Sequence, residues 1–186
     1  MSNKSLGLLF RNKQLIKTKK MKKLIFLSIL GLTLSLNAQN ISKNAIGLRF
    51  GDNSGFGAEV SYQLKLQKNN RLELDLGWRN NNSFNFIKGT GLYQWVLNIE
   101  GDFNWYAGVG GGLGSWSYNS DYKKNYPYLV TNGSGTYAFL AGNLGIEYDF
   151  DFPLLVSLDF RPEFVLSNGY GDNYGSDIAL ALRYQF

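Results

Sequence analysis

The sequence predicts an all-β chain, with an export segment followed by eight antiparallel strands that close into an up-and-down transmembrane β-barrel. Three observations support this prediction. Beyond residue 40, apolar and polar residues alternate with a period of two, and no stretch repeats apolar residues at helical spacing. Clusters of Asn, Gly, Asp and Ser separate the alternating segments, as turns do. Several segments run to 9 to 11 residues, the length that a tilted strand needs to cross a bilayer.

The segment before the first strand has the order of a secretory signal peptide. Met21 is followed by Lys22 and Lys23, then by apolar residues 24–36 and a polar end at residues 37–39. The apolar stretch has 13 residues, fewer than a spanning helix needs, which disfavours a permanent anchor. We expect residues 1–20 to be a mis-assigned upstream extension, or else a long positive region. Residues 21–39 are then the signal peptide, cleaved after residue 38 or 39, and residues 40–186 the barrel domain.

The positive charge of the chain lies mostly in the segment that export would remove. Of the 19 Lys and Arg residues, eight precede Asn40, whereas all 14 Asp and Glu residues follow it. The mature part therefore has 11 basic and 14 acidic residues, a net charge of −3. A nucleic-acid partner needs a basic face that stays with the folded domain, so we expect none. The chain has no Cys for disulfides or thiolate metal sites, and no His.

Eight segments show the alternation that predicts a strand. In chain order they are residues 46–50, 56–64, 71–79, 92–99, 105–114, 138–149, 156–163 and 176–186. The third is the clearest, because Leu72, Leu74, Leu76 and Trp78 share one face and charged residues occupy most of the other. The fourth is less regular, since two of its apolar residues fall on the polar face.

The fifth segment has glycines in place of polar side chains. Gly108, Gly110, Gly112 and Gly114 share its inner face. They lack the G-x-G-x-x-G spacing and the following helix of a phosphate-binding loop. A glycine strip in a strand instead leaves space for long side chains from the opposite wall, with a thin water path as the alternative.

Charged residues of both signs occupy the polar faces of the predicted strands. In a narrow lumen such residues can pair, which limits the cost of removing them from bulk water, whereas a solvated outer face is the alternative. The predicted lumen network consists of Arg49, Glu59, Arg71, Glu73, Asp75, Arg79, Glu147, Asp159, Arg161, Glu163 and Arg183.

Aromatic residues and connection lengths indicate that the apolar face meets lipid. Aromatic residues gather near the strand ends in two groups, one including Trp105, Tyr148 and Phe186, the other including Trp78 and Trp116. Residues 66–70, 100–103 and 149–153 form short predicted turns, whereas residues 80–90, 115–135 and 167–175 form longer predicted loops. Only the loop at residues 52–55 departs from this alternation. The longest loop is rich in Tyr and Asn, a composition suited to binding, although a mobile polar loop is the alternative.

The signal peptide, the eight alternating segments and the C-terminal pattern resemble small outer-membrane barrels of the OmpA/OmpX type. The terminal pattern is the most specific part of the resemblance: Ile178, Leu180, Leu182, Tyr184 and Phe186. The resemblance implies a location in the cell outer membrane, contact with outer-membrane lipid, and recognition of the last strand by the barrel-assembly machinery. It implies no functional residue, because this family shares an architecture and not a site.

The sequence indicates a non-enzymatic protein. Barrel enzymes resembling lipid A palmitoyltransferase, lipid A deacylase or omptin proteases depend on a catalytic His, which this chain lacks. Glu73 and Asp75 share one face, as a pair for glycoside hydrolysis would, but Arg71 and Arg79 on that face favour ion pairs. We expect no catalytic residue, cofactor or metal, and a structural or adhesive role with loops that face an unidentified extracellular ligand. The alternatives are a narrow pore for water, ions or small solutes and a secreted soluble ligand-binding barrel.

Overall fold

A computed structural model describes residues 41–51, 57–80, 84–118, 134–166 and 173–186. They form β1 (Asn44–Gly51), β2 (Gly57–Lys65), β3 (Asn70–Asn80), β4 (Phe84–Glu100), β5 (Phe103–Tyr118), β6 (Ser134–Asp149), β7 (Leu154–Val165) and β8 (Tyr174–Gln185). No helix among these residues is long and apolar enough to span a membrane. The predicted upstream extension and signal peptide lie outside the described residues.

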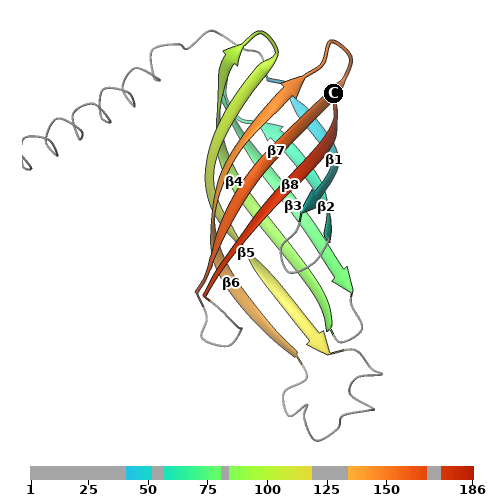
Figure 1. The fold of residues 1–186 in the computed structure, drawn as a ribbon, viewed down its shortest axis with the longest axis vertical. Helices are drawn as coiled ribbons and strands as arrows, with labels where there is room; N and C mark the ends of the chain where they lie inside the picture. The colour runs from blue at the N-terminus through green and yellow to red at the C-terminus, as the bar shows by residue number, and fades with distance from the viewer. Residues whose placement is uncertain (1–40, 52–56, 81–83, 119–133, 167–172) are drawn as a thin grey trace, which may run out of the picture. The chain divides into compact units, whose positions relative to one another are not determined.

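The eight strands close into one antiparallel barrel in sequence order (Figure 1). Each strand pairs with the next, and β8 returns to pair with β1, where Leu182 lies opposite Leu48. The closing strands are also joined by two backbone hydrogen bonds, of 2.9 and 3.0 Å, between Asn44 and Phe186. Closure removes the free sheet edges that an open sheet would present. The predicted eight-stranded up-and-down barrel is confirmed.

The two ends of the barrel differ in their connections. The terminal end, defined here as the end that carries Ile41 and Phe186, has the short turns at residues 66–69, 101–102 and 150–153. In the shortest turn Gly101 has a φ of 55°, a left-handed conformation that glycine adopts with little strain. The amide of Asn98 donates to the Gly101 carbonyl at 2.8 Å and holds this turn. The opposite end is called the loop end.

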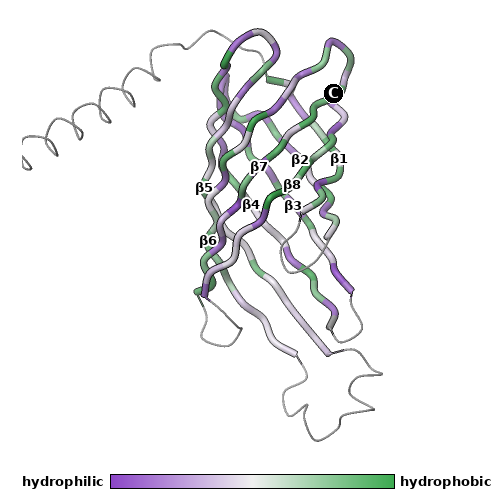
Figure 2. Tube along the Cα trace, in the orientation of Figure 1, coloured by the Kyte–Doolittle hydropathy of each residue, from purple (hydrophilic) through white to green (hydrophobic). Residues whose placement is uncertain are grey.

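Apolar side chains point out of the barrel wall and polar side chains point into it. Leu74, Leu144 and Leu180 are 47%, 54% and 46% exposed, whereas Arg49 and Glu73 are completely buried. Figure 2 shows the resulting alternation of hydrophobic and hydrophilic residues along each strand. A soluble protein buries these residue types the other way round. The burial therefore excludes the alternative of a soluble barrel with an apolar interior.

Aromatic side chains gather around the terminal end. The rings of Phe103 and Tyr148 lie 4.6 Å apart, and those of Tyr93 and Trp95 lie 5.0 Å apart. Tyrosine and tryptophan favour the boundary between apolar and aqueous surroundings, because each combines an apolar ring with a polar group. Trp116 was predicted for the second aromatic group, but it alternates with the buried Gly114 and so falls on the lumen side of β5.

All three predicted long loops are partly strand, the third only at Tyr174 and Gly175, which begin β8. β4 begins at Phe84, so residues 84–90 pair with β3 and β5. β5 continues to Tyr118 and β6 begins at Ser134, so both ends of the predicted 115–135 loop belong to strands. Gly89 and Gly91 explain the first error, because they occupy outward positions of β4 where the alternation calls for apolar side chains. The centre of the longest loop, with Lys123 and Lys124, lies outside the described residues.

Candidate functional site

The inward faces of the strands bring ten of the eleven predicted charged residues into the lumen, where each is buried. The set extends to two further residues, Lys88 and Asp177, so that five cationic side chains face seven carboxylates. Every one of these carboxylates lies within 3.5 Å of a cationic nitrogen. Every ion pair of this network joins two different strands. The barrel must therefore close before the charges are compensated.

Arg49 of β1 joins three acidic residues on three other strands. Its guanidinium nitrogens lie 2.6 Å from Asp159 of β7, 2.7 Å from Asp177 of β8 and 3.0 Å from Glu59 of β2. Its Nε also donates to Asp159 at 3.2 Å, which makes that contact bidentate. Arginine suits this position because its planar donors can engage several carboxylates in a fixed geometry.

Arg161 of β7 holds the acidic group on the opposite wall. Its guanidinium lies 2.6 Å from Asp75, 3.1 Å from Glu73 and 3.1 Å from Glu59. Glu73 is also 3.0 Å from Arg183, and it accepts a hydrogen bond of 2.6 Å from a neighbouring glutamine amide. Glu73 and Asp75 are therefore engaged by arginines, as the ion-pair interpretation of this pair requires.

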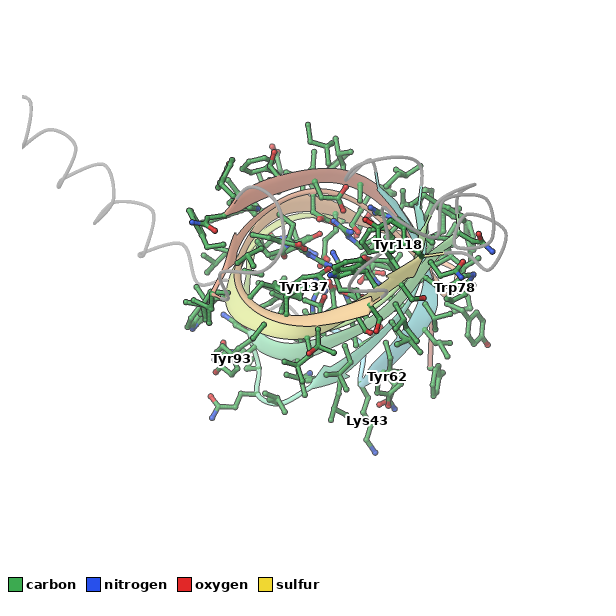
Figure 3. All side chains as sticks on the ribbon, turned by 90° about the horizontal axis from the view of Figure 1, so that it is seen from below. Lys43, Tyr62, Trp78, Tyr93, Tyr118 and Tyr137 are labelled. Carbon is green, nitrogen blue, oxygen red and sulfur yellow. The ribbon has the colours of Figure 1, made fainter. Side chains whose placement is uncertain are left out.

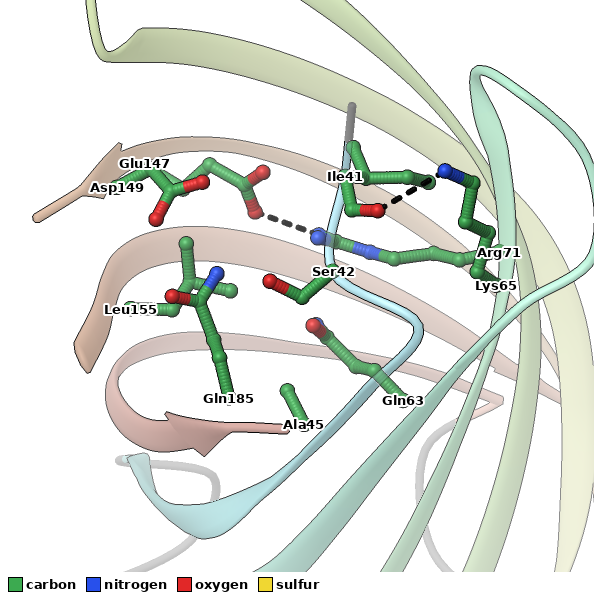
Figure 4. Close-up of a pocket in the computed structure, with 10 residues that line it drawn as sticks. All are labelled: Ile41, Ser42, Ala45, Gln63, Lys65, Arg71, Glu147, Asp149, Leu155 and Gln185. Atoms are coloured by element: carbon green, nitrogen blue, oxygen red, sulfur yellow. Dashed lines mark hydrogen bonds and ion pairs between the residues drawn. The ribbon is translucent and has the colours of Figure 1, made fainter. Parts of the chain in front are cut away.

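A second group of contacts lies nearer the terminal end (Figure 4). Arg71 pairs with Glu147 at 2.7 Å, and its guanidinium lies 4.8 Å from the centre of the Tyr106 ring. Arg71 also donates to Gln94 at 2.6 Å. Gln94 donates to Asn143 at 2.8 Å, and Asn143 donates to Asp159 at 3.3 Å. Two amides thus connect this pair to the main network.

The mouth at the terminal end is capped by the residues that precede β1. Ile41 is buried against Val96 and Tyr106, and its carbonyl accepts a hydrogen bond of 3.1 Å from Lys65. A small pocket beside it is lined by both strand residues and Ser42. Ile41 therefore narrows the lumen at this end.

The glycine strip of β5 leaves space for large side chains, but they come from the neighbouring strand β6 and not, as the sequence predicted, from the opposite wall. A side chain at Gly112 would collide with the Gly89 carbonyl oxygen of β4 and come within 2.7 Å of the Phe139 ring, and one at Gly114 would collide with Tyr137. Both rings come from β6 and lie on the lumen side of the wall. Figure 3, viewed from the loop end, shows Tyr137 inside the barrel and Trp78 outside it. Of the two alternatives for the strip, packing space is the one that the structure supports.

Four residues of the observed network were not predicted from the sequence. Lys88 pairs with Glu163 at 2.7 Å and with Glu59 at 3.5 Å, but it had been placed in a loop. Asp177 lies on the polar face of the predicted strand at residues 176–186, but the predicted network does not include it. The uncharged bridges Gln94 and Asn143 carry no signal apart from their place on the polar face.

Arg79 is the predicted network residue that stands apart. It is only partly buried, and among the described residues no carboxylate forms an ion pair with it. Its guanidinium lies across Gly57, where a side chain would come within 2.7 Å of the Arg79 Cζ. Arg79 is therefore at the loop-end mouth of the lumen and outside the ion-pair network.

The strand predicted as the assembly signal forms the outer side of the closing seam. Ile178, Leu182 and Phe186 are 63%, 43% and 59% exposed on the outside of the barrel, in line with Leu180 and Tyr184. Residues 179–185 of this strand pair with β1 along the seam. An apolar outer face and a paired backbone edge are thus combined in one strand.

Comparison with solved structures decides the fold. No protein-family model and no curated protein matches the sequence. Neisserial surface protein A is 12% identical, with a TM-score of 0.55 and coverage of 77% of this chain and 94% of that one. The N-terminal β-barrel domain of Pseudomonas aeruginosa OprF is 13% identical, with a TM-score of 0.57 and coverage of 78% and 100%. Ail of Yersinia pestis is 14% identical, with a TM-score of 0.50 and coverage of 78% and 97%.

This chain has the fold of the small outer-membrane barrels. The OmpA/OmpX-type architecture that the sequence resembled is thereby confirmed as a transmembrane β-barrel. At these identities the likeness shows the fold alone, because one barrel architecture serves many functions. Within that fold, the described residues contain no group of three or more Asp and Glu side chains placed to hold a metal ion.

Proposed function

We propose that this chain is an integral outer-membrane protein with a closed lumen and a structural or adhesive role, and that its loop end faces the exterior. The observation that carries the proposal is the burial of the charged network inside a barrel whose outer surface is apolar. Such a surface is stable against lipid and unfavourable in water, and the enclosed charges are compensated within the protein.

The contents of the lumen support a barrel that does not conduct. Arg49 and Arg161 reach carboxylates on other strands across the interior, and Phe139 fills the space beside the glycine strip. A pore requires a continuous path that an ion or a solute can enter and leave. The narrow pore is therefore the less favoured of the two membrane functions.

The absence of His from the sequence supports a non-enzymatic role. General base catalysis would then depend on a carboxylate or a lysine with access to substrate. The carboxylates described in the lumen are buried beside cations, as Glu73 is beside Arg161 and Arg183. The positions of these carboxylates favour ion pairs between strands over general base catalysis.

The adhesive part of the proposal draws on the comparisons. The solved Ail structure carries the name attachment invasion locus protein, and its barrel is similar to this one. Export through residues 21–39 and recognition of β8 by the barrel-assembly machinery would bring the chain to the outer membrane. The loop end would then project outward, because the barrel places its short turns at the opposite, terminal end.

The proposal is tested by expressing the full chain in a Gram-negative host and fractionating the envelope. We expect the mature protein in the outer membrane, soluble only with detergent, and with different gel mobility before and after boiling in SDS. A protein that dissolves without detergent and shows no mobility shift would overturn the proposal. In planar bilayers we expect no steps of conductance, and a steady conductance would replace the closed lumen with the pore.

A further inference from the structure

The residues that precede β1 cross the terminal mouth of the lumen. We call residues 41–43 the strap. Ile41 is 7% exposed and lies against Val96 of β4 and Tyr106 of β5. β1 itself pairs with β2 and β8, so β4 and β5 belong to the far side of the closed barrel. The strap therefore reaches from the wall at β1 to the opposite wall, in front of the lumen.

Side-chain contacts, and not strand pairing, hold Ile41 in place. The carbonyl of Ile41 accepts a hydrogen bond of 3.1 Å from the side chain of Lys65 (Figure 4). Neither Ile41 nor Ser42 is part of a strand. The predicted cleavage after residue 38 or 39 would make the strap the free end of the mature chain. The strap can therefore move without breaking the backbone pairs that close the barrel.

The contact surface for Ile41 explains an irregularity of the fourth predicted strand. Val96 is an apolar residue on the inward face of β4, where the alternation calls for a polar side chain. It lies directly opposite Tyr106 of β5, and both side chains are buried. Three apolar groups in contact exclude water from the space between them. The departure from alternation at Val96 thus corresponds to an apolar seal that Ile41 completes.

A polar layer lies directly behind this seal. Along the inward face of β4, Gln94 follows Val96, and Leu92 follows Gln94. Gln94 makes the amide hydrogen bonds described above. Leu92 packs with Phe139 and Ala141 in a second, deeper apolar cluster. Water that entered at the terminal end would therefore meet polar groups first and an apolar barrier next.

The closed strap leaves a buried polar group beside it without a partner. The hydroxyl of Tyr106 is buried and has no hydrogen-bond partner among the described residues. A buried hydroxyl without a partner is destabilising, and contact with water removes that cost. The pocket beside the strap has a volume of about 10 Å³, room for about one water molecule. Burial of Ile41 therefore favours the closed strap, whereas hydration of Tyr106 favours an open one.

We propose that the strap is a gate between the periplasm and the polar layer of the lumen, with Ile41 as its stopper. When Ile41 leaves Val96 and Tyr106, water enters from the terminal end as far as the cluster around Leu92. The rest of the lumen stays closed, so the open state is a blind hydrated chamber and not a pore. This inference rests on the proposed function, which places the terminal end on the periplasmic side.

The test measures labelling by iodoacetamide of the mature protein in phospholipid nanodiscs, at single cysteines introduced into a chain that has none. Ala45→Cys places the thiol at the pocket, where Ala45 is 2% exposed, and Ala141→Cys places it in the deeper cluster. Labelling follows the open population when opening and closing are fast. Burial of one isoleucine corresponds to a population ratio of about tenfold to a hundredfold. Ile41→Ser should therefore accelerate labelling of Ala45→Cys by this factor and leave Ala141→Cys slow.

Two comparisons separate the stopper from a general loosening of the barrel. Ile99→Ser is the matched control, because Ile99 is 57% exposed at the same end of β4. Ile41→Leu should keep the slow rate, since it retains an apolar side chain of the same size. Ile41→Ala is the second opening variant, in case Ile41→Ser does not fold, and it should also accelerate labelling.

The gate is overturned if Ile41→Ser and Ile41→Ala leave labelling at Ala45→Cys unchanged, or if Ile99→Ser accelerates it equally. Fast labelling of Ala141→Cys, or steps of conductance in Ile41→Ser, would overturn the blind chamber, because the path would then run through the barrel. A heat-dependent mobility shift is measured on every variant. If the shift is present and labelling is unchanged, the inference fails while the membrane barrel stands, whereas loss of the shift in the unmodified chain refutes the proposed function itself.

Discussion

Replacing Arg161 by methionine should destabilise the barrel more than any other single neutralisation on β7, because this side chain is completely buried beside three carboxylates. Glu59 would keep Arg49 at 3.0 Å and Lys88 at 3.5 Å. Glu73 would keep Arg183 at 3.0 Å. Asp75, in contrast, would lose the cation that the described residues provide for it.

The expected loss of stability follows from this difference between Asp75 and the two glutamates. Removing one partner of a buried ion pair costs about 3–5 kcal/mol, because the other charge stays buried without compensation. The cost in Arg161→Met should fall mainly on Asp75. The double variant Arg161→Met/Asp75→Asn should therefore recover part of the stability, giving a coupling energy of about 1–3 kcal/mol in a double-mutant cycle.

The assay is reversible urea unfolding in lipid vesicles, followed by tryptophan fluorescence and by the fraction that migrates as folded protein. Lys68→Met in an exposed turn is the control, and its free energy of unfolding should change by less than about 0.5 kcal/mol. A loss of less than about 1 kcal/mol in Arg161→Met, with no recovery on adding Asp75→Asn, would show that the network does not determine stability.

Three further predictions test other parts of the structure. Asp75→Asn alone should be close to neutral in urea unfolding, because one Asp75 oxygen has no hydrogen-bond partner among the described residues and the network holds more carboxylates than cations. Gly112→Val should lower the free energy of unfolding by at least about 1–3 kcal/mol, since the new side chain would collide with the Gly89 carbonyl oxygen of β4 and meet the Phe139 ring at 2.7 Å. Unchanged stability would contradict the close packing around the strip. Leu144→Arg should cost about 2–4 kcal/mol on the lipid face. Ser117→Arg should cost much less, because Ser117 occupies an outward position of β5 beyond the apolar residues, and equal costs in vesicles would contradict this placement.

The strands and their faces could be predicted from the sequence, because a period of two is a local property. Leu72 to Trp78 reveal the outward face of β3 without any knowledge of its neighbours. The pairs across the lumen could not be predicted in this way. Arg49 meets Asp159 across 110 positions of sequence, and such contacts depend on how the sheet tilts and closes.

The errors at the loop end have a single physical cause. The strand predictions depend on apolar residues at the outward positions of every strand. Where Gly89 and Gly91 occupy outward positions, or where Ser115 and Ser117 do, that assumption indicates a loop even though the backbone continues as strand. Trp116 was predicted in an aromatic belt facing lipid for the same reason, although it lies on the lumen side of β5.

The length of β6 indicates that this strand extends beyond the hydrocarbon layer at the loop end. A tilted strand crosses the hydrocarbon layer in about 9–11 residues, whereas β6 has 16 residues. Roughly five residues must then lie beyond that layer. The five residues at the loop end of β6, Ser134 to Ala138, match this length. The terminal end of β6 cannot supply this surplus, because its outward residues Leu144 and Ile146 are apolar and exposed. Strand length and the outward Ser134 and Thr136 therefore place the same boundary, on the loop-end side of Leu140.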